Sequence, residues 1–168
     1  MTRDIILKKT IFLILFLSAQ IVLSQPFEGM TLFSPIQAGG GGGGNFTTFL
    51  IDNDLDVINS WNHPRGIAST AYLTEDSILV YPYRVQNPTM TAGGVGGGLS
   101  KYNWAGELLW YYEFANDTYQ HHHDIEPLLN GNILVIVWER KTASEAYAVG
   151  RQSIDNSLNE NLSKINKK

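Results

Sequence analysis

The sequence predicts an all-β chain, an incomplete β-propeller of about two four-stranded antiparallel blades that follows a signal peptide. Two glycine-rich runs, at residues 39–44 and 93–98, each precede a similar order of short β-rich segments. Corresponding tryptophans, Trp61 and Trp110, lie 49 residues apart, and a period near 50 with about four short strands is typical of propeller blades. At residues 133–138 both alternating faces are apolar, so each face needs a covering layer such as a neighbouring blade.

Residues 1–24 have the three-part pattern of a secretory signal peptide. A basic start precedes an apolar run at residues 11–17, and the small residue Ser24 suits cleavage by a signal peptidase. The apolar run is shorter than the roughly 20 residues that a membrane-spanning helix needs. We therefore expect cleavage after Ser24, a secreted or periplasmic location, and no membrane attachment after cleavage. An uncleaved membrane anchor is the alternative.

The rest of the chain divides into a partial propeller at residues 25–151 and a tail at residues 152–168. The two blades are expected at about residues 39–88 and 93–142. The tail is rich in Asn and Lys and loses the strand pattern, so it is predicted to be irregular or weakly helical. A closed propeller needs at least about four blades, so two blades indicate a truncated chain. A small open β-sheet protein capped by a C-terminal helix is the alternative.

Composition excludes several kinds of chemistry. The 168 residues include no cysteine, which excludes disulfides, thiolate zinc sites and cysteine nucleophiles. The formal net charge is -4, so nucleic acid is not an expected partner. Neither glycine run leads into the Lys-Ser/Thr pair of a phosphate-binding loop, and such runs more often form flexible linkers or closely packed strand entries. We expect no nucleotide and no other cofactor.

Three of the four histidines lie in the segment 119–126, which is the chemically distinctive part of the chain. Residues alternate sides in an extended strand, so His121 and His123 are expected on one face and His122 and Asp124 on the other. An imidazole can act as a nucleophile, a general base or a metal ligand, and a neighbouring carboxylate such as Asp124 can orient it. A polar loop with one packed histidine is the plainer alternative.

Two single residues outside this segment were candidates for a site. Arg140 is a cation near the end of the second predicted blade, and its guanidinium would suit a sulfate or phosphate ester. A surface arginine without a ligand is the commoner case. His63 precedes Pro64 and is interpreted as a turn residue.

Three stretches of the chain resemble the bacterial aryl-sulfate sulfotransferases, which are six-bladed propeller enzymes of the secretory route. They are residues 103–110 (NWAGELLW), 121–135 (HHHDIEPLLNGNILV) and 138–151 (WERKTASEAYAVGR). The resemblance covers roughly residues 28–151 and is most specific from the His-His-Asp to the Asn-Gly-Asn sequence. It implies an N-terminal third of such an enzyme, with about two of the six blades.

The resemblance implies transfer of a sulfuryl group from a phenolic sulfate ester to a phenol acceptor through a sulfo-histidine. His123 or His122 would be the catalytic histidine of this chain, contacting sulfate or transferring a proton, with Asp124 and His121 in support. Arg140 would contact the sulfate oxygens. The histidine that carries the sulfuryl group would lie in later blades, so we expect little or no turnover from this chain alone.

Two other functions stay open. The chain is alternatively a noncatalytic secreted β-propeller module that binds through its blade edges, with self-association through exposed blade faces. It is alternatively a small histidine-based metal-binding protein, in which His121 and His123 would bind zinc together with Glu126 or a later carboxylate.

Overall fold

The computed structural model describes residues 27–36, 46–91, 93–153 and 163–164. The predicted signal peptide, the first glycine-rich run and most of the predicted tail lie outside these ranges. Within the described ranges, no helix is long and apolar enough to cross a membrane.

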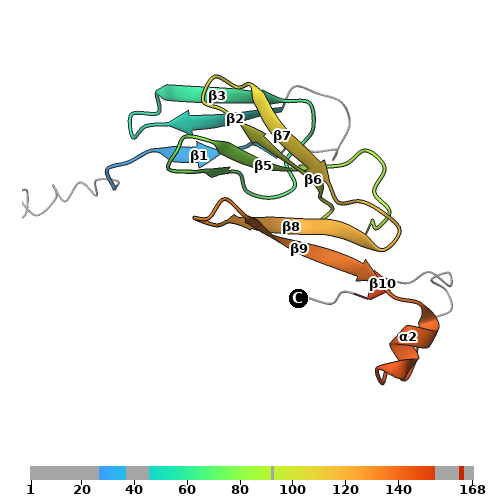
Figure 1. Cartoon of the computed structure of the whole chain (residues 1–168). Coiled ribbons are helices and arrows are strands. Elements are labelled where there is room, and N and C mark those ends of the chain that lie inside the picture. Colours follow the sequence, from blue (N-terminus) through green and yellow to red (C-terminus); the bar gives the residue numbers. More distant parts are fainter. Residues whose placement is uncertain (1–26, 37–45, 92, 154–162, 165–168) are drawn as a thin grey trace, which may run out of the picture.

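The described residues form three antiparallel sheets, which confirms the all-β prediction (Figure 1). The first sheet has the order β1-β2-β3, from strands Thr31–Phe33, Phe46–Ile51 and Val57–His63. The second has the order β4-β5-β6-β7, from strands Tyr72–Leu73, Leu79–Arg84, Gly97–Tyr102 and Leu108–Glu113. The third has the order β10-β9-β8, from strands Ser163–Lys164, Ile133–Arg140 and Tyr119–Pro127.

The sheets are offset from the predicted repeat. Strands β4 and β5 come from the first predicted unit, residues 39–88, and β6 and β7 come from the second, residues 93–142, yet all four form one sheet. The described residues therefore form one four-stranded and two three-stranded sheets instead of two four-stranded ones. The reason is that the second glycine-rich run continues directly into β6. It therefore lies inside one sheet and does not mark a boundary between two sheets. A Cβ at Gly98 would lie 2.2 Å from the Tyr83 ring, so glycine permits this close packing.

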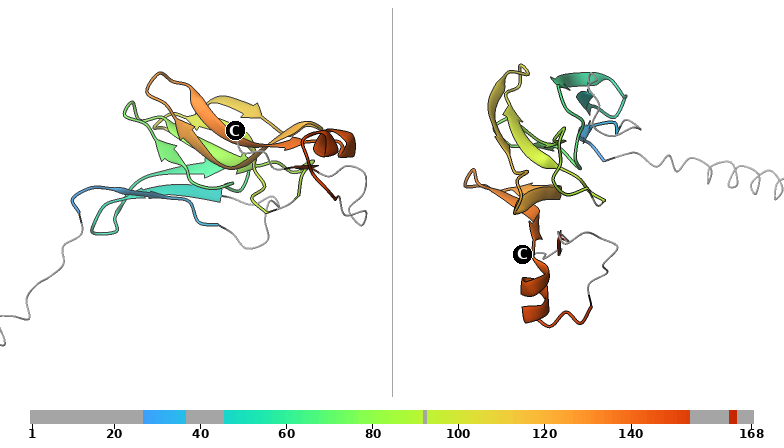
Figure 2. Two further views of the ribbon diagram at one scale, coloured as in Figure 1. Left: turned by 90° about the horizontal axis from the view of Figure 1, so that it is seen from below. Right: turned by 90° about the vertical axis from the view of Figure 1, so that its right-hand side faces the viewer.

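The second sheet is apolar on both faces and forms a core with each neighbouring sheet. On one face, Leu79 and Tyr81 of β5 pack in a cluster with Trp61 of the first sheet. On the opposite face, Val80 packs in a cluster with Ile125 of the third sheet. Successive side chains of a strand point to opposite faces, which is why one strand serves both cores. Figure 2 shows the three sheets as successive layers.

Helix α2 (Ala143–Ala148) follows β9, ahead of the tail that was predicted to be irregular or weakly helical. It begins with a capping box, in which the Thr142 side chain accepts from the Glu145 N–H and the Glu145 side chain accepts from the Thr142 N–H. In the predicted tail, the described residues Ser163–Lys164 form β10 and pair with β9. The Thr-x-x-Glu pattern at residues 142–145 is the local sequence signal for this helix.

Candidate functional site

A bulge in β8 sets the geometry of the histidine segment. Pairing with β9 runs from Tyr119 to His121 and resumes at Ile125, which lies opposite Val135. The residues between these paired stretches outnumber those that oppose them on β9, which defines a bulge. His123, inside the bulge, has a φ of 60°, a left-handed conformation that is uncommon for residues other than glycine. The regular alternation predicted for this segment is therefore wrong.

The bulge brings the rings of His122 and His123 together, although alternation would place them on opposite faces. Their centroids are 4.2 Å apart, and Nδ1 of His123 lies 3.1 Å from Nε2 of His122. The same Nε2 lies 3.1 Å from the Gly93 carbonyl oxygen. A carbonyl can only accept, so this nitrogen of His122 carries a proton. His122 also packs against Trp138, with the centroids 4.3 Å apart.

Two glycines of the second glycine-rich run allow the chain to pass close to this bulge. The Gly94 carbonyl accepts from the His123 N–H at 3.0 Å, and the Gly96 N–H donates to the His121 carbonyl at 3.2 Å. A Cβ at Gly94 would lie 2.0 Å from the His123 ring, and one at Gly96 would lie 2.3 Å from the His121 ring. Side chains at these two positions would displace the histidines. This run therefore forms a closely packed strand entry.

His121 is a buried, neutral ring. Its residue is 0% exposed, and Nδ1 accepts from the Gly97 N–H at 3.1 Å. Because Nδ1 is an acceptor, the proton of the neutral ring is on Nε2, which is buried and has no hydrogen-bond partner in the described chain. Burial lowers the pKa of His121 to about 4. This residue therefore supports the bulge from the core and does not face solvent.

Asp124 connects the bulge to the second sheet. Its carboxylate accepts a hydrogen bond from the Tyr72 hydroxyl at 3.2 Å. Desolvation, followed by the charge of this carboxylate, raises the pKa of Tyr72. Asp124 therefore links β8 to β4 through this hydrogen bond. The sequence analysis expected it to orient a histidine ring instead.

Arg140 is held by the loop between β5 and β6. Its Nη2 donates to the Thr89 carbonyl at 2.8 Å, and its Nε is buried without a hydrogen-bond partner among the described residues. The predicted anion-binding fork is therefore partly occupied by the protein's own backbone. The β5–β6 loop is also fixed by Gln120 of β8, whose side-chain oxygen accepts from the Met90 N–H at 2.9 Å.

His63 was interpreted as a turn residue, but the structure places it in the core as the last residue of β3. It is 3% exposed and stacks on Tyr81, with the ring centroids 3.6 Å apart. Its Nε2 lies 2.9 Å from the Thr48 hydroxyl, which in turn lies 2.7 Å from the Ser34 hydroxyl. Burial lowers the pKa of His63 to about 4. The period-two spacing from Trp61, which is buried on the same face, is the signal that would have located it.

A cavity of about 500 Å³ lies between the β4–β5 and β8–β9 hairpins. Its walls are mainly apolar and include Val80 and Ile133, while Lys101 and Glu126 supply charged groups. Tyr72 lines it as well. Because the Tyr72 hydroxyl reaches Asp124, the cavity adjoins the histidine bulge without being lined by its rings.

The zinc ligand set suggested by the sequence is not brought together. In the described part of the chain, no group of three or more His, Asp or Glu residues could hold a metal ion. The bulge explains this result for His121 and His123, because it buries the first ring and leaves the second exposed.

Comparisons of the chain with protein-family models, with curated proteins and with solved structures each found no match. The resemblance to the aryl-sulfate sulfotransferases therefore stays a prediction.

Proposed function

We propose that this chain is the N-terminal part of a secreted or periplasmic β-propeller enzyme of the aryl-sulfate sulfotransferase type. Its second sheet supports a propeller, because that sheet is apolar on both faces, as a blade between two neighbours must be. The contact between His122 and His123 is the observation that carries the chemical part of the proposal. It supplies an imidazole pair with one exposed ring.

His123 is the residue that we assign to the sulfate group. Its ring is exposed, and the bulge holds it beside His122, whose own ring is fixed by the Gly93 carbonyl and by Trp138. A protonated imidazole donates hydrogen bonds to sulfate oxygens, and a neutral one accepts the proton of a phenol. The buried, neutral ring of His121 supports this pair from the core.

In the reaction proposed for the complete enzyme, the S–O bond of the donor ester breaks as an N–S bond forms to a histidine. That N–S bond then breaks as the oxygen of the acceptor phenol attacks the sulfur. The leaving phenolate takes up a proton and the acceptor phenol gives one up, and we assign the transfer of this proton to the His122–His123 pair. We assign the sulfated histidine to no residue of this chain, and we therefore expect little or no turnover from it alone.

Binding of an aryl sulfate tests the assignment of His123 directly. We would titrate 4-nitrophenyl sulfate into the chain and follow the ring signals of all four histidines by NMR. The signals of His122 and His123 should shift, whereas those of the buried His63 and His121 serve as internal controls and should not. His123→Gln should abolish the shift. Unchanged signals for the rings of His122 and His123, or equal binding by the variant, would contradict the assignment.

A transfer assay tests the expected lack of turnover. Release of 4-nitrophenol from its sulfate ester, with phenol as the acceptor, should not exceed the rate without protein. Acceptor-dependent release that His123→Gln removes would show that the chain holds a complete site, contrary to the proposal.

The cavity between the hairpins favours a noncatalytic binding module as the second candidate. Its volume of about 500 Å³ suits a small ligand, and the histidine rings do not line it. The same NMR titration, with aryl sulfate or phenol, distinguishes the two functions. Shifts of the Ile133 and Val80 signals without any shift of the histidine ring signals would favour this second function.

A further inference from the structure

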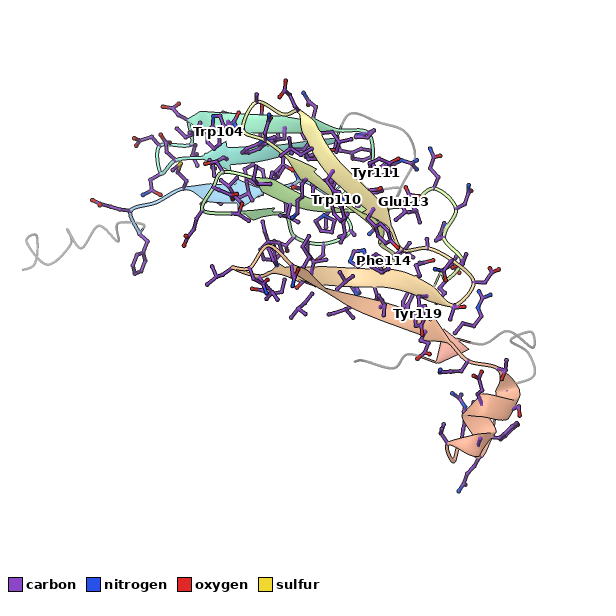
Figure 3. The ribbon with its side chains drawn as sticks, viewed as in Figure 1. Trp104, Trp110, Tyr111, Glu113, Phe114 and Tyr119 are labelled. Carbon is purple, nitrogen blue, oxygen red and sulfur yellow. The ribbon has the colours of Figure 1, made fainter. Side chains whose placement is uncertain are left out.

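Strand β7 is a sheet edge with an exposed row of apolar side chains. It is the last strand in the order β4-β5-β6-β7, so no strand of the described chain pairs with its outer side. All six of its residues are exposed. Trp110, Tyr111 and Glu113 can be followed along it in Figure 3. An exposed apolar edge strand is a template for pairing with another strand.

Other edge strands of the described sheets make contacts with neighbouring segments of the chain. The side chains of Asn59 and Trp61 on β3 donate to backbone carbonyls of the β6–β7 turn, at 2.8 and 2.9 Å. Strand β8 is hydrogen-bonded to the segment 93–97, and β10 pairs with β9. Among the described residues, no strand pairs with the outer side of β7, and its sequence contains neither the lysine nor the proline that commonly protects an edge.

The register between β6 and β7 identifies the peptide groups on the open side. Gly98 lies opposite Glu113, and the N–H of Phe114 donates to the Gly97 carbonyl. In an antiparallel ladder, this bond makes Gly98 and Glu113 a non-hydrogen-bonded pair. The N–H and C=O of Glu113 therefore point away from β6, and by alternation so do those of Tyr111.

We propose that a second copy of this chain pairs with β7 along this edge, strand to strand and antiparallel, about a two-fold axis at Tyr112. In this register Tyr111 of one copy lies opposite Glu113 of the other, so the outward peptide groups of both strands meet. Tyr112 lies opposite its own counterpart, and aromatic cross-strand pairs stabilise antiparallel sheets. No like charges are opposed, because each Glu113 faces a tyrosine. The edge is thus complementary to itself.

The exposed area is large enough for a modest interface. Trp110, Tyr111 and Tyr112 are 42%, 64% and 51% exposed, and with roughly 150–250 Å² for each aromatic side chain they offer about 300 Å² per copy. Leu108 and Leu109, which are each half exposed, add to this. If all of this exposed area were buried, the total over both copies would be roughly 1,000 Å², the lower end for a specific interface. We therefore expect a concentration-dependent dimer.

This inference does not depend on the proposed function. The outermost strand of a propeller blade lies at the rim of the ring, so neighbouring blades would not cover β7. A dimer without aryl-sulfate binding, or binding without a dimer, would separate the two proposals.

Sedimentation equilibrium of the full chain tests the pairing. A lysine on an edge strand opposes pairing with another strand, so Tyr111→Lys should weaken dimerisation at least about tenfold. Tyr147→Lys is the matched control, because it changes a tyrosine on α2 that is also more than half exposed, and it should dimerise like the unchanged chain. A monomeric unchanged chain, or equal dimerisation by Tyr111→Lys, would overturn the proposal. Larger assemblies would also overturn it, since a two-fold pairing closes on itself.

Hydrogen exchange in the unchanged chain provides a second measurement that does not rely on how Tyr111→Lys folds. The amides of Tyr111 and Glu113 should exchange more slowly as the protein concentration rises, because pairing would occupy them. The amide of Tyr112, which points towards β6, should show a much smaller dependence. Exchange at Tyr111 and Glu113 that is independent of concentration would contradict the proposed edge.

Discussion

Acid should destabilise this fold through two buried histidines, His63 and His121. Burial lowers the pKa of each ring to about 4, from a value of 6.5 when unperturbed. Between these values the unfolded chain binds protons that the folded chain does not, so stability falls as the pH falls. The contribution of the two rings is complete above about pH 6.5 and is lost progressively towards pH 4.

The expected effect is large compared with the stability of a typical domain. A pKa difference of about 2.5 corresponds to roughly 3 kcal/mol for each ring. The two rings together are therefore expected to lower the free energy of unfolding by about 6 kcal/mol, when ordinary domains have only about 5–15 kcal/mol in total. A charged ring would also leave a buried donor unpaired, because His63 Nδ1 and His121 Nε2 are both buried without hydrogen-bond partners in the described chain.

Urea unfolding at pH 7.5 and pH 4.5, followed by tryptophan fluorescence, would measure this effect. His63→Gln keeps a side-chain donor near the Thr48 hydroxyl but cannot titrate, so it should halve the pH dependence of the unfolding free energy. His123→Gln is the matched control for the substitution, because it makes the same change at an exposed ring. Equal stability at both pH values, or ring signals of His63 and His121 that titrate near pH 6.5, would refute the reasoning.

Two further predictions concern the packing around the bulge. Gly96→Ala should lower the free energy of unfolding by about 1–3 kcal/mol, because its Cβ would lie 2.3 Å from the His121 ring. Gly93→Ala is the control, because a Cβ at this position would meet nothing within 4 Å, and it should change the free energy of unfolding by less than about 0.5 kcal/mol. Urea unfolding of both variants measures the difference. Equal stabilities would disprove the close approach of Gly96 to His121. Tyr72→Phe should cost about 1 kcal/mol by removing its hydrogen bond to Asp124. An unchanged melting temperature would contradict that assignment.

The sequence predicted the strand content because short runs of apolar residues are a local property. Residues 133–138 are apolar at every position, and the structure pairs them in β9. The grouping of strands into sheets is not local, so the repeat did not locate it. Gly97 and Gly98 signalled a boundary in the sequence, but the space they leave is filled by Val85 and Tyr83 of the preceding strand and loop.

The sequence pointed to the histidine segment as the candidate site, but it could not predict the geometry of that segment. The rule that placed His122 and His123 on opposite faces assumes an unbroken ladder, and a bulge depends on what the rest of the chain packs against the strand. Here that partner is the segment with Gly94 and Gly96, some 25 residues earlier in the chain. Burial of His63 was foreseeable from Trp61, whereas burial of His121 was not.

The long-range contacts of the bulge also affect the order in which parts of the chain fold. The strands of the second sheet lie side by side in the order of the chain, and pairings between chain neighbours form fast. The bond from the Gly97 N–H to His121 joins residues 24 positions apart and needs β6 to be in place first. We therefore expect the histidine segment to assemble after the transition state for folding. Substitutions there would then accelerate unfolding and leave the folding rate nearly unchanged.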